Sequence, residues 1–140
     1  GLMINELAPR THNSGHYSIE ACDLSQFDLQ LLAVSAQQLR EPALQAPGAL
    51  MVNLLGFEQR SADDPAAAYE VQRQALAGLP EAHLHWYGKA GASVGRKLGH
   101  VTLLLQQQDP VARRQEAMQR LEAVRQIWPL PPGPEPGLSF

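Results

Sequence analysis

The sequence predicts an α+β fold, in which a strand and a helix come before a small antiparallel sheet packed with helices. The first observation is a set of three short runs with apolar or alternating character, which are typical of strands, at 50–55, 83–87 and 97–106. The second is a set of capping residues, two of them followed by proline, that mark helix starts: Ser25, Asp64–Pro65 and Asp109–Pro110. A small antiparallel sheet packed on one or two helices is an α+β arrangement.

The N-terminal part begins with an apolar strand end and a polar loop. Leu2–Ile4 is expected to be buried strand, and 5–16 to be the loop that leaves it. Ser25 with Asp28 three residues later resembles a capping box, which predicts a helix over about 26–38. Three residues are expected to form the packed face of that helix: Phe27, Leu31 and Val34.

The second part is expected to hold the sheet. Gly56 ends the strand at 50–55, and a helix should follow Asp64–Pro65, with five residues at helical spacing: Tyr69, Gln72, Arg73, Leu76 and Leu79. The aromatic run 83–87, a glycine-containing connection at 88–95 and the run 97–106 predict a hairpin with a long loop. The last helix should follow Asp109, with its apolar face made by Val111, Met118, Leu121, Val124 and Trp128.

Breakers and composition divide the chain into three regions. Pro42, Pro47 and Gly48 predict a boundary after residue 41, and prolines dominate after Trp128. We therefore expect one unit at 1–41, a small α+β domain at 42–128 and a Pro-rich tail at 129–140.

Composition excludes several classes of function. The net charge of −3 argues against nucleic-acid binding, and no apolar run approaches the roughly 20 residues that span a bilayer. The single cysteine cannot form an internal disulfide, and no secretion signal is visible. The expected location is the cytoplasm.

The loop at 5–16 concentrates the side chains that carry chemistry. Carboxylate and carboxamide oxygens suit magnesium, so Glu6 and Asn5 are candidate metal ligands. Arg10 offers a fork for phosphate or carboxylate, and Asn13 and Ser14 could bind further oxyanions or hydroxyls. The loop predicts a magnesium–phosphate site beside an anionic substrate.

Histidines and hairpin cations have plainer interpretations. His12 and His16 are four residues apart, but Pro9, Asn13 and Gly15 disfavour the helix that a zinc pair would need. From composition alone, the hairpin cations are solvated surface charges: Lys89, Arg96 and Lys97. Packing is expected for the aromatic and histidine side chains nearby: Phe57, His83, His85, Trp86 and Tyr87. His100, which could help to orient a substrate, is not among the expected site residues.

Four ordered segments resemble one known enzyme family. They are Asn5–His16 with its continuation to Phe27, Met51–Gly56, His83–Lys89 and Gly95–Val101. The family is 5-(carboxyamino)imidazole ribonucleotide synthetase, the ATPase subunit of phosphoribosylaminoimidazole carboxylase, an ATP-grasp ligase of purine biosynthesis. The departures from its usual pattern at Tyr17, Asp28 and Leu98 touch no proposed charged site.

The resemblance implies a reaction and a set of roles. The family carboxylates 5-aminoimidazole ribonucleotide with bicarbonate, using ATP and passing through carboxyphosphate. Glu6 and Asn5 would hold magnesium on the ATP phosphates, while Arg10 and His12 would lie near bicarbonate or carboxyphosphate as catalytic residues. Asn13 and Ser14 would contact the ribonucleotide. The hairpin cations would bind its phosphate or the reacting anions, with Lys89 also catalytic: Lys89, Arg96 and Lys97.

The resemblance also implies what surrounds the chain. Residues 1–41 would end an ATP-grasp domain whose ATP-binding half precedes Gly1, so this chain alone is expected to be inactive. The complete enzyme is expected to be a homodimer, with the downstream mutase of the pathway as a functional partner.

Two alternatives stay open. Formate-dependent glycinamide ribonucleotide transformylase, a sister ATP-grasp enzyme, shares part of the loop pattern but usually has Asp-Thr-Gly in place of Asn13–Gly15. The other alternative is a non-catalytic module that serves folding or dimerisation.

Overall fold

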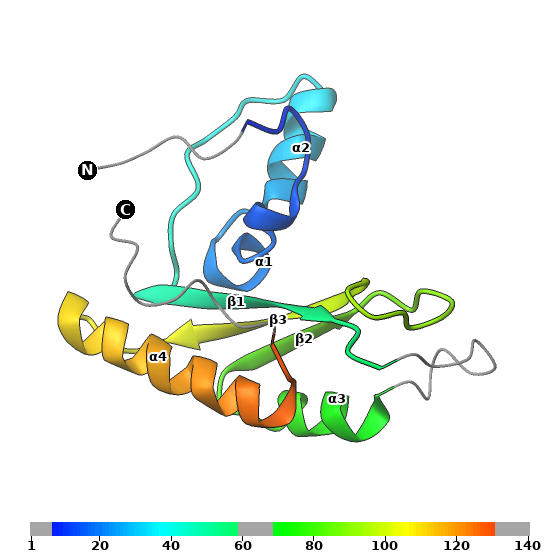
Figure 1. Cartoon of the computed structure of the whole chain (residues 1–140). Coiled ribbons are helices and arrows are strands. Elements are labelled where there is room, and N and C mark those ends of the chain that lie inside the picture. Colours follow the sequence, from blue (N-terminus) through cyan, green and yellow to red (C-terminus); the bar gives the residue numbers. More distant parts are fainter. Residues whose placement is uncertain (1–6, 59–68, 131–140) are drawn as a thin grey trace.

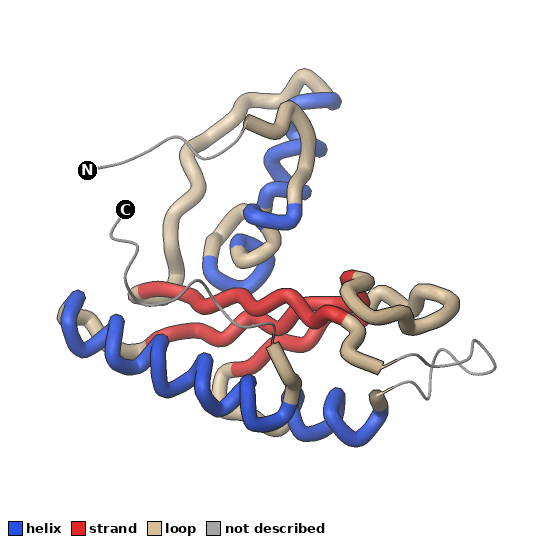
Figure 2. Tube along the Cα trace, in the orientation of Figure 1, coloured by secondary structure: helices blue, strands red, loops and turns tan. Residues whose placement is uncertain are grey.

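The computed structural model describes residues 7–58 and 69–130, which form a three-stranded sheet between two groups of helices (Figure 1). The strands are β1 (Gly48–Leu55), β2 (Ala82–Trp86) and β3 (Lys97–Leu105), in the order β1-β3-β2, with both pairs antiparallel. The helices α3 (Glu70–Ala77) and α4 (Pro110–Ile127) cover one face, while α1 (Ser18–Ala21) and α2 (Gln26–Val34) stand on the other (Figure 2). The predicted α+β class and the antiparallel hairpin are confirmed.

The central strand β3 separates an apolar core from a polar row. Side chains alternate between the faces of a sheet. Those on the α3/α4 side join one core, made by Val52, Leu54, Val101, Leu103, Leu76, Val124 and Trp128 among others. On the opposite face, the register places Asn53 beside His100 and His100 beside His85, so that three polar residues cross the sheet in a line. This row lies under the N-terminal segment.

Local sequence signals fixed two helix starts. The Ser25 side chain accepts from the backbone N–H of Asp28 while the Asp28 carboxylate accepts from that of Ser25, which is the predicted capping box. Asp109 caps α4 by accepting from the backbone N–H of Ala112 at 2.8 Å.

Helix α2 differs from the prediction in its end and in its packing. It ends at Val34, before residue 38, because Ala36 adopts a left-handed backbone with φ of 54°. The predicted packed face is exposed, with Phe27 at 41%, Leu31 at 65% and Val34 at 70%. The sheet lies against α1 and the loop before it, so the face of α2 is covered only at Phe27, whose ring stacks on His16 at 5.6 Å, among the described residues.

The predictions of the apolar faces of α3 and α4 were also partly wrong. Tyr69 precedes α3 rather than lying within it, with φ of 60°, and its ring is buried in the core. Val111 and Met118 of α4 are exposed at 66% and 57%, because the stripe that ends in Val124 and Trp128 fills the contact with the sheet. The remaining predicted features fall outside the described residues: the strand at 2–4, the Asp64–Pro65 helix start and the tail beyond 130.

The N-terminal segment holds structure that the sequence did not predict. A 3₁₀ turn at Asn13–Gly15 leads into the short helix α1. The Ser18 hydroxyl donates to the carbonyl of Gly15 at 2.6 Å and accepts from the backbone N–H of Gln26 at 2.9 Å, which ties the turn to α2. Within the described ranges, no helix is long and apolar enough to cross a bilayer.

Candidate active site

The loop at 10–16 is fastened to α2 by the side chain of Gln26. Its Oε1 accepts from the backbone N–H of His12 at 2.7 Å, and its Nε2 donates to the His12 carbonyl at 2.9 Å and contacts His16 Nδ1 at 2.6 Å. Gly15 permits this approach, because a Cβ there would lie 2.7 Å from Gln26 Oε1. The loop therefore has one defined position above the polar row of the sheet.

Asn13 joins this loop to two strands of the second unit. Its Nδ2 donates to Asn53 Oδ1 on β1 at 2.9 Å, and its side chain lies near Tyr87, which follows β2, closely enough to affect the pKa of that residue. The Tyr87 hydroxyl lies 2.8 Å from Nδ1 of His100 on β3. Burial raises the pKa of Tyr87, and Asn13 acts in the opposite direction.

Three imidazoles stack beneath the loop. His100 lies between His16 and His85, with ring centroids 5.0 Å and 4.5 Å away. Nε2 of His85 pairs with Oε1 of Glu20 in α1 at 2.5 Å, which closes the far end of the stack. Burial lowers the pKa of His100 to about 4, and His85, His16 and Lys97 add repulsion of positive charge. The pKa of His16 is lowered for the same main reason.

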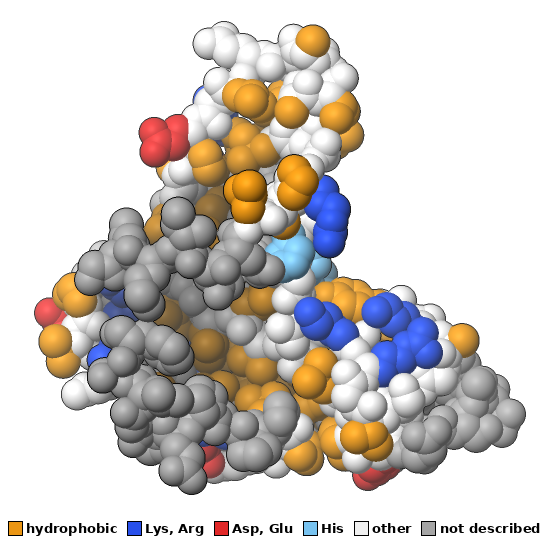
Figure 3. All heavy atoms as spheres, turned by 45° about the horizontal axis from the view of Figure 1, so that its top comes forward, with side chains coloured by type: hydrophobic (Ala, Val, Ile, Leu, Met, Phe, Trp, Pro, Cys, Tyr) orange, Lys and Arg blue, Asp and Glu red, His pale blue; other side chains and the backbone are white. Residues whose placement is uncertain are grey.

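Cations border this cluster at the base of the hairpin loop. Lys89 Nζ donates to the carbonyl of Lys97 at 3.0 Å and lies 5.4 Å from the ring centre of Tyr87. Arg96 donates to the carbonyl of Ala90 at 2.8 Å. In the described part of the chain, no carboxylate pairs with Lys89, Arg96 or Lys97, so their charges can act on an anion from solvent. Figure 3 shows basic side chains on either side of exposed histidine atoms.

The structure brings together some of the predicted site residues and leaves others apart. Asn13, Lys89 and Lys97 meet around Tyr87 and His100. His12 instead turns inward along the loop, where its Nδ1 accepts from the backbone N–H of Ser14 at 3.3 Å and lies 3.0 Å from the Ser14 hydroxyl. Arg10 is exposed, and its one side-chain hydrogen bond within the described residues goes to the neighbouring Thr11 carbonyl; Asn5 and Glu6 lie outside those residues.

Sequence reasoning missed the residues that support the site. His85 and Tyr87 were expected only to pack, and His100, Asn53 and Gln26 were not among the expected site residues. The one available signal was alternation, since His83, His85 and Tyr87 share one side of the strand run. Register against β3 and contact with the distant loop cannot be read from that signal.

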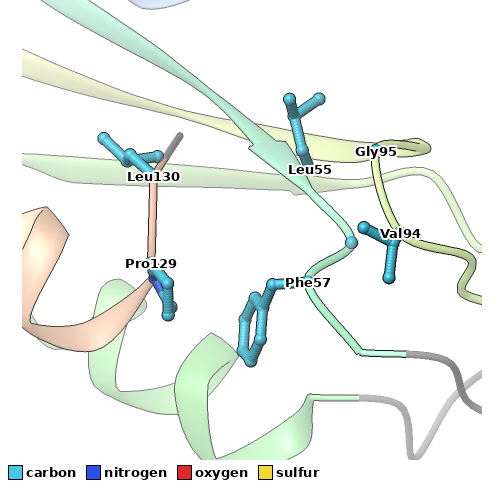
Figure 4. Close-up of a pocket in the computed structure, with 7 residues that line it drawn as sticks. Leu55, Phe57, Val94, Gly95, Pro129 and Leu130 are labelled. Carbon is cyan, nitrogen blue, oxygen red and sulfur yellow. The ribbon is translucent and has the colours of Figure 1, made fainter. Parts of the chain in front are cut away.

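Two hollows differ sharply in character. One, of about 460 Å³, lies between α1, α2 and the sheet and is lined by His16, Ile19, Phe27, Leu84, His85, Trp86, Tyr87 and His100. The other, of about 270 Å³, is lined by Leu55, Gly56, Phe57, Val94, Gly95, Pro129 and Leu130, which bring no charged side chain (Figure 4). Only the first adjoins groups able to do chemistry. No group of three or more metal-binding side chains occurs among the described residues.

His100 is expected to make stability depend on pH. The unfolded chain binds a proton there at about pH 6.5 but the folded chain only at about pH 4, so stability is complete above 6.5 and falls as pH drops toward 4. The loss should reach about 3 kcal/mol, and His16 acts in the same direction. Urea unfolding at pH 7 and pH 4.5 measures it.

A matched pair of variants separates this histidine from the rest of the chain. His100→Asn should remove most of the difference between the two pH values, while the exposed His83→Asn should leave it intact. An equal acid loss in His100→Asn and the parent chain would show that other groups are responsible.

Comparisons with known proteins agree on one group of enzymes. Residues 49–114 match the family model of the phosphoribosylaminoimidazole carboxylase C-terminal domain, and residues 1–27 match that of the ATP-grasp domain. The N5-carboxyaminoimidazole ribonucleotide synthase of Synechococcus elongatus is 54% identical over 130 residues, which are 93% of this chain and 32% of the relative. The chain thus spans about a third of the length of this curated relative.

Solved structures give the same result. The N5-carboxyaminoimidazole ribonucleotide synthetase of Thermus thermophilus matches with a TM-score of 0.67 and 33% identity, over 93% of this chain and 31% of that one. The Aspergillus clavatus N5-carboxyaminoimidazole synthase was solved with ADP and 5-aminoimidazole ribonucleotide. It matches with a TM-score of 0.59 and 29% identity, over 82% of this chain and 29% of that one.

Proposed function

We propose that this chain forms the C-terminal part of an ATP-dependent ligase, a 5-(carboxyamino)imidazole ribonucleotide synthetase, also named N5-carboxyaminoimidazole ribonucleotide synthase. The proposal is supported by the match of the chain to the C-terminal portion of this family. The ligase carboxylates the exocyclic amine of 5-aminoimidazole ribonucleotide. ATP phosphorylates bicarbonate to carboxyphosphate and leaves as ADP; the amine then takes the carboxyl carbon, and phosphate departs. The observation that supports the proposal is that the loop at 13–16 lies on the sheet, through Asn13 on Asn53 and His16 on His100, beside the cationic base of the hairpin.

The roles of this chain's residues follow from charge and position. Arg10 and His12 act on bicarbonate and carboxyphosphate, and Asn13 and Ser14 contact the ribonucleotide. Three cations bind its phosphate or the reacting anions: Lys89, Arg96 and Lys97. Phosphoryl transfer depends on positioning and on neutralising developing charge, and these groups can supply both.

ATP and magnesium are assigned to the start of the chain. Glu6 and Asn5 supply the oxygen donors that magnesium prefers, so the donor set fits the ion. The ion would neutralise charge on the ATP phosphates. The ADP bound to the Aspergillus clavatus relative supports the use of ATP.

The remaining parts of the proposal concern organisation. We place the boundary between the ATP-grasp end and the C-terminal domain after residue 41, consistent with the separate family models for 1–27 and 49–114. A cytoplasmic homodimer that passes its product to the mutase of the same pathway completes the proposal.

A hybrid enzyme tests the function. In it, this chain replaces the matching segment of the Synechococcus elongatus relative, and ADP release is followed with bicarbonate and 5-aminoimidazole ribonucleotide. We expect turnover within about tenfold of the parent relative, because 54% identity leaves the segment close to the parent's. The isolated chain should show no ribonucleotide-stimulated ATP hydrolysis.

Substrate choice separates the alternatives. Turnover of glycinamide ribonucleotide with formate, in place of aminoimidazole ribonucleotide, would assign the chain to the sister enzyme. A hybrid that binds ATP but turns over neither ribonucleotide would favour a non-catalytic module. Robust turnover by the isolated chain would show that no further ATP-binding part is needed.

A further inference from the structure

We infer that Gln26 is a positioning residue of the candidate site, whose single carboxamide holds the backbone of His12 and keeps His16 in the neutral form that is protonated on Nε2. The inference rests on the proposed function, because it takes the loop at 10–16 as part of the reacting site. It gives a role to a residue of α2 that has none assigned, and it states which ring nitrogen of His16 carries the proton.

The backbone of His12 fixes which end of the Gln26 carboxamide is the oxygen. A backbone N–H can only donate a hydrogen bond, and a carbonyl can only accept one. The N–H of His12 lies 2.7 Å from Oε1 of Gln26, and the His12 carbonyl lies 2.9 Å from Nε2. Exchanging the two amide atoms would set donor against donor and acceptor against acceptor, so this orientation is the one that satisfies both groups.

The same amide nitrogen fixes the proton of His16. Nε2 of Gln26 lies 2.6 Å from Nδ1 of His16, and a carboxamide nitrogen donates and does not accept. Nδ1 must therefore accept, which leaves the proton of the neutral ring on Nε2. Both N–H groups of Gln26 are then used, one on the His12 carbonyl and one on His16.

Protonation of His16 would break this contact. A charged imidazole carries a proton on both nitrogens, so an N–H at Nδ1 would face an N–H of Gln26. Burial is the main cause that lowers the pKa of His16. The titratable and charged groups around the ring are His12 in the same loop, Glu20 on α1, His85 on β2, and His100 and Lys97 on β3. Of these, only Glu20 favours the charged form, so the hydrogen bond and most of the neighbouring charges act in the same direction.

Gln26 is itself held firmly at its backbone. Its N–H donates to the Ser18 hydroxyl at 2.9 Å, and that hydroxyl donates to the Gly15 carbonyl at 2.6 Å. The residue follows Ser25, the N-cap of α2, so the capping box fixes the point from which the side chain leaves the helix. A Cβ on Gly15 would lie 2.7 Å from Gln26 Oε1, so the loop leaves room for the carboxamide. The carboxamide is therefore placed before any ligand arrives.

The consequence is that one side chain sets both the position of His12 and the seat of the loop on the sheet. His16 stacks on His100 with 5.0 Å between ring centroids. Burial lowers the pKa of His100 to about 4, so a neutral His16 lies against a neutral ring without charge repulsion. Displacement of a catalytic group by about 1 Å can cost a hundredfold in rate. Loss of Gln26 should therefore reduce turnover more than it weakens the binding of ATP.

Kinetics of the hybrid enzyme test the positioning role. Gln26→Met keeps the length of the side chain and removes its three hydrogen bonds, so kcat with 5-aminoimidazole ribonucleotide should fall about tenfold to a hundredfold. KM for ATP should stay within about twofold. Gln30→Met makes the same replacement at an exposed position of the same helix and should change neither value. A kcat for Gln26→Met equal to that for Gln30→Met would overturn the inference.

A second substitution separates positioning from a loss of folding. In Gln26→Glu the introduced carboxylate can accept from the His12 N–H, but it has no N–H for His16, so Nδ1 of His16 must carry a proton. The pKa of His16 should then rise above its ordinary value of 6.5, whereas in the parent and in Gln26→Met it should stay below. NMR titration of the His16 ring in the chain itself measures this. If Gln26→Glu and Gln26→Met give the same titration of His16, the amide does not contact Nδ1 and the inference fails.

Nitrogen-15 NMR of the histidine rings tests the tautomer without any activity. In the parent chain at neutral pH, His16 should show a protonated Nε2 and an unprotonated Nδ1. A proton on Nδ1, or a rapid mixture of the two tautomers, would overturn the inference whatever the kinetics.

The outcomes also distinguish the inference from the proposed function. If His16 has the expected tautomer but the unsubstituted hybrid turns over no aminoimidazole ribonucleotide, the proposed function fails and the hold of Gln26 on the loop remains. If the hybrid is active and Gln26→Met keeps the kcat of the parent, the inference fails and the proposed function remains.

Discussion

Replacing Lys89 with methionine in the hybrid enzyme is expected to raise KM for 5-aminoimidazole ribonucleotide about tenfold to a hundredfold, the range for losing one charge-assisted hydrogen bond. Lys89 is exposed, has no carboxylate partner among the described residues, and is held by the Lys97 carbonyl and the Tyr87 ring. Its charge is thus directed at an anion without neutralisation by the protein. KM for ATP should change little.

Two comparisons make this result specific. Arg114→Met removes an exposed cation on α4, across the sheet from the site, and should leave both KM values unchanged. With the riboside that lacks the phosphate, Lys89→Met should have little further effect if Lys89 binds that phosphate. An undiminished effect with the riboside would move Lys89 to the reacting anions, and an unchanged KM for the ribonucleotide would remove it from the site.

Replacing Trp128 with alanine is expected to lower the free energy of unfolding by about 3–5 kcal/mol, a large part of the stability of a domain of this size. Its ring is fully buried and meets Phe57, Tyr69 and Trp86 at centroid distances of 5.2, 4.9 and 6.1 Å. Its Nε1 donates to the carbonyl of Leu55 at 2.9 Å, at the end of β1. The substitution leaves a cavity and an unpaired carbonyl together.

Urea unfolding of the chain measures this loss, with two variants for comparison. Trp128→Phe keeps most of the apolar volume and loses the hydrogen bond, so it should fall between the parent and Trp128→Ala. Met118→Ala, an exposed position on the same helix, should cost less than about 0.5 kcal/mol. A loss below 1 kcal/mol in Trp128→Ala would show that this cluster is not central to stability.

Helix starts and the hairpin were predictable because their signals are local. The Ser25–Asp28 capping box and the Asp109 cap each depend on atoms three residues apart, and both are present as predicted. Burial was less predictable, because it depends on what lies opposite. Phe27, Leu31 and Val34 have the spacing of a packed face, yet they are exposed because the sheet contacts α1 and its preceding loop instead.

Some residues of the candidate site could be predicted from the sequence, and others could not. Residue type and order pointed to Asn13 and Lys89, since a dense polar loop and a cationic hairpin are visible in the sequence. Residue type and order could not identify Tyr87 and His100 as site residues. An aromatic residue next to a strand and a histidine within a strand are ordinary core residues. Only the tertiary structure shows that the two hydrogen-bond to each other and that His100 stacks on His16 of the N-terminal loop.

The sequence alone determined the α+β class, the helix caps, the hairpin and the resemblance to a family, because each of these is carried by neighbouring residues or by ordered short motifs. The tertiary structure decided which faces are buried and which polar atoms remain available for a ligand. The physical reason is that β3 is the central strand, so its pairing with both neighbours sets Asn53, His100 and His85 in one row. The loop that carries Asn13 lies on that row. The contact between Asn13 and Asn53 is a consequence of that register.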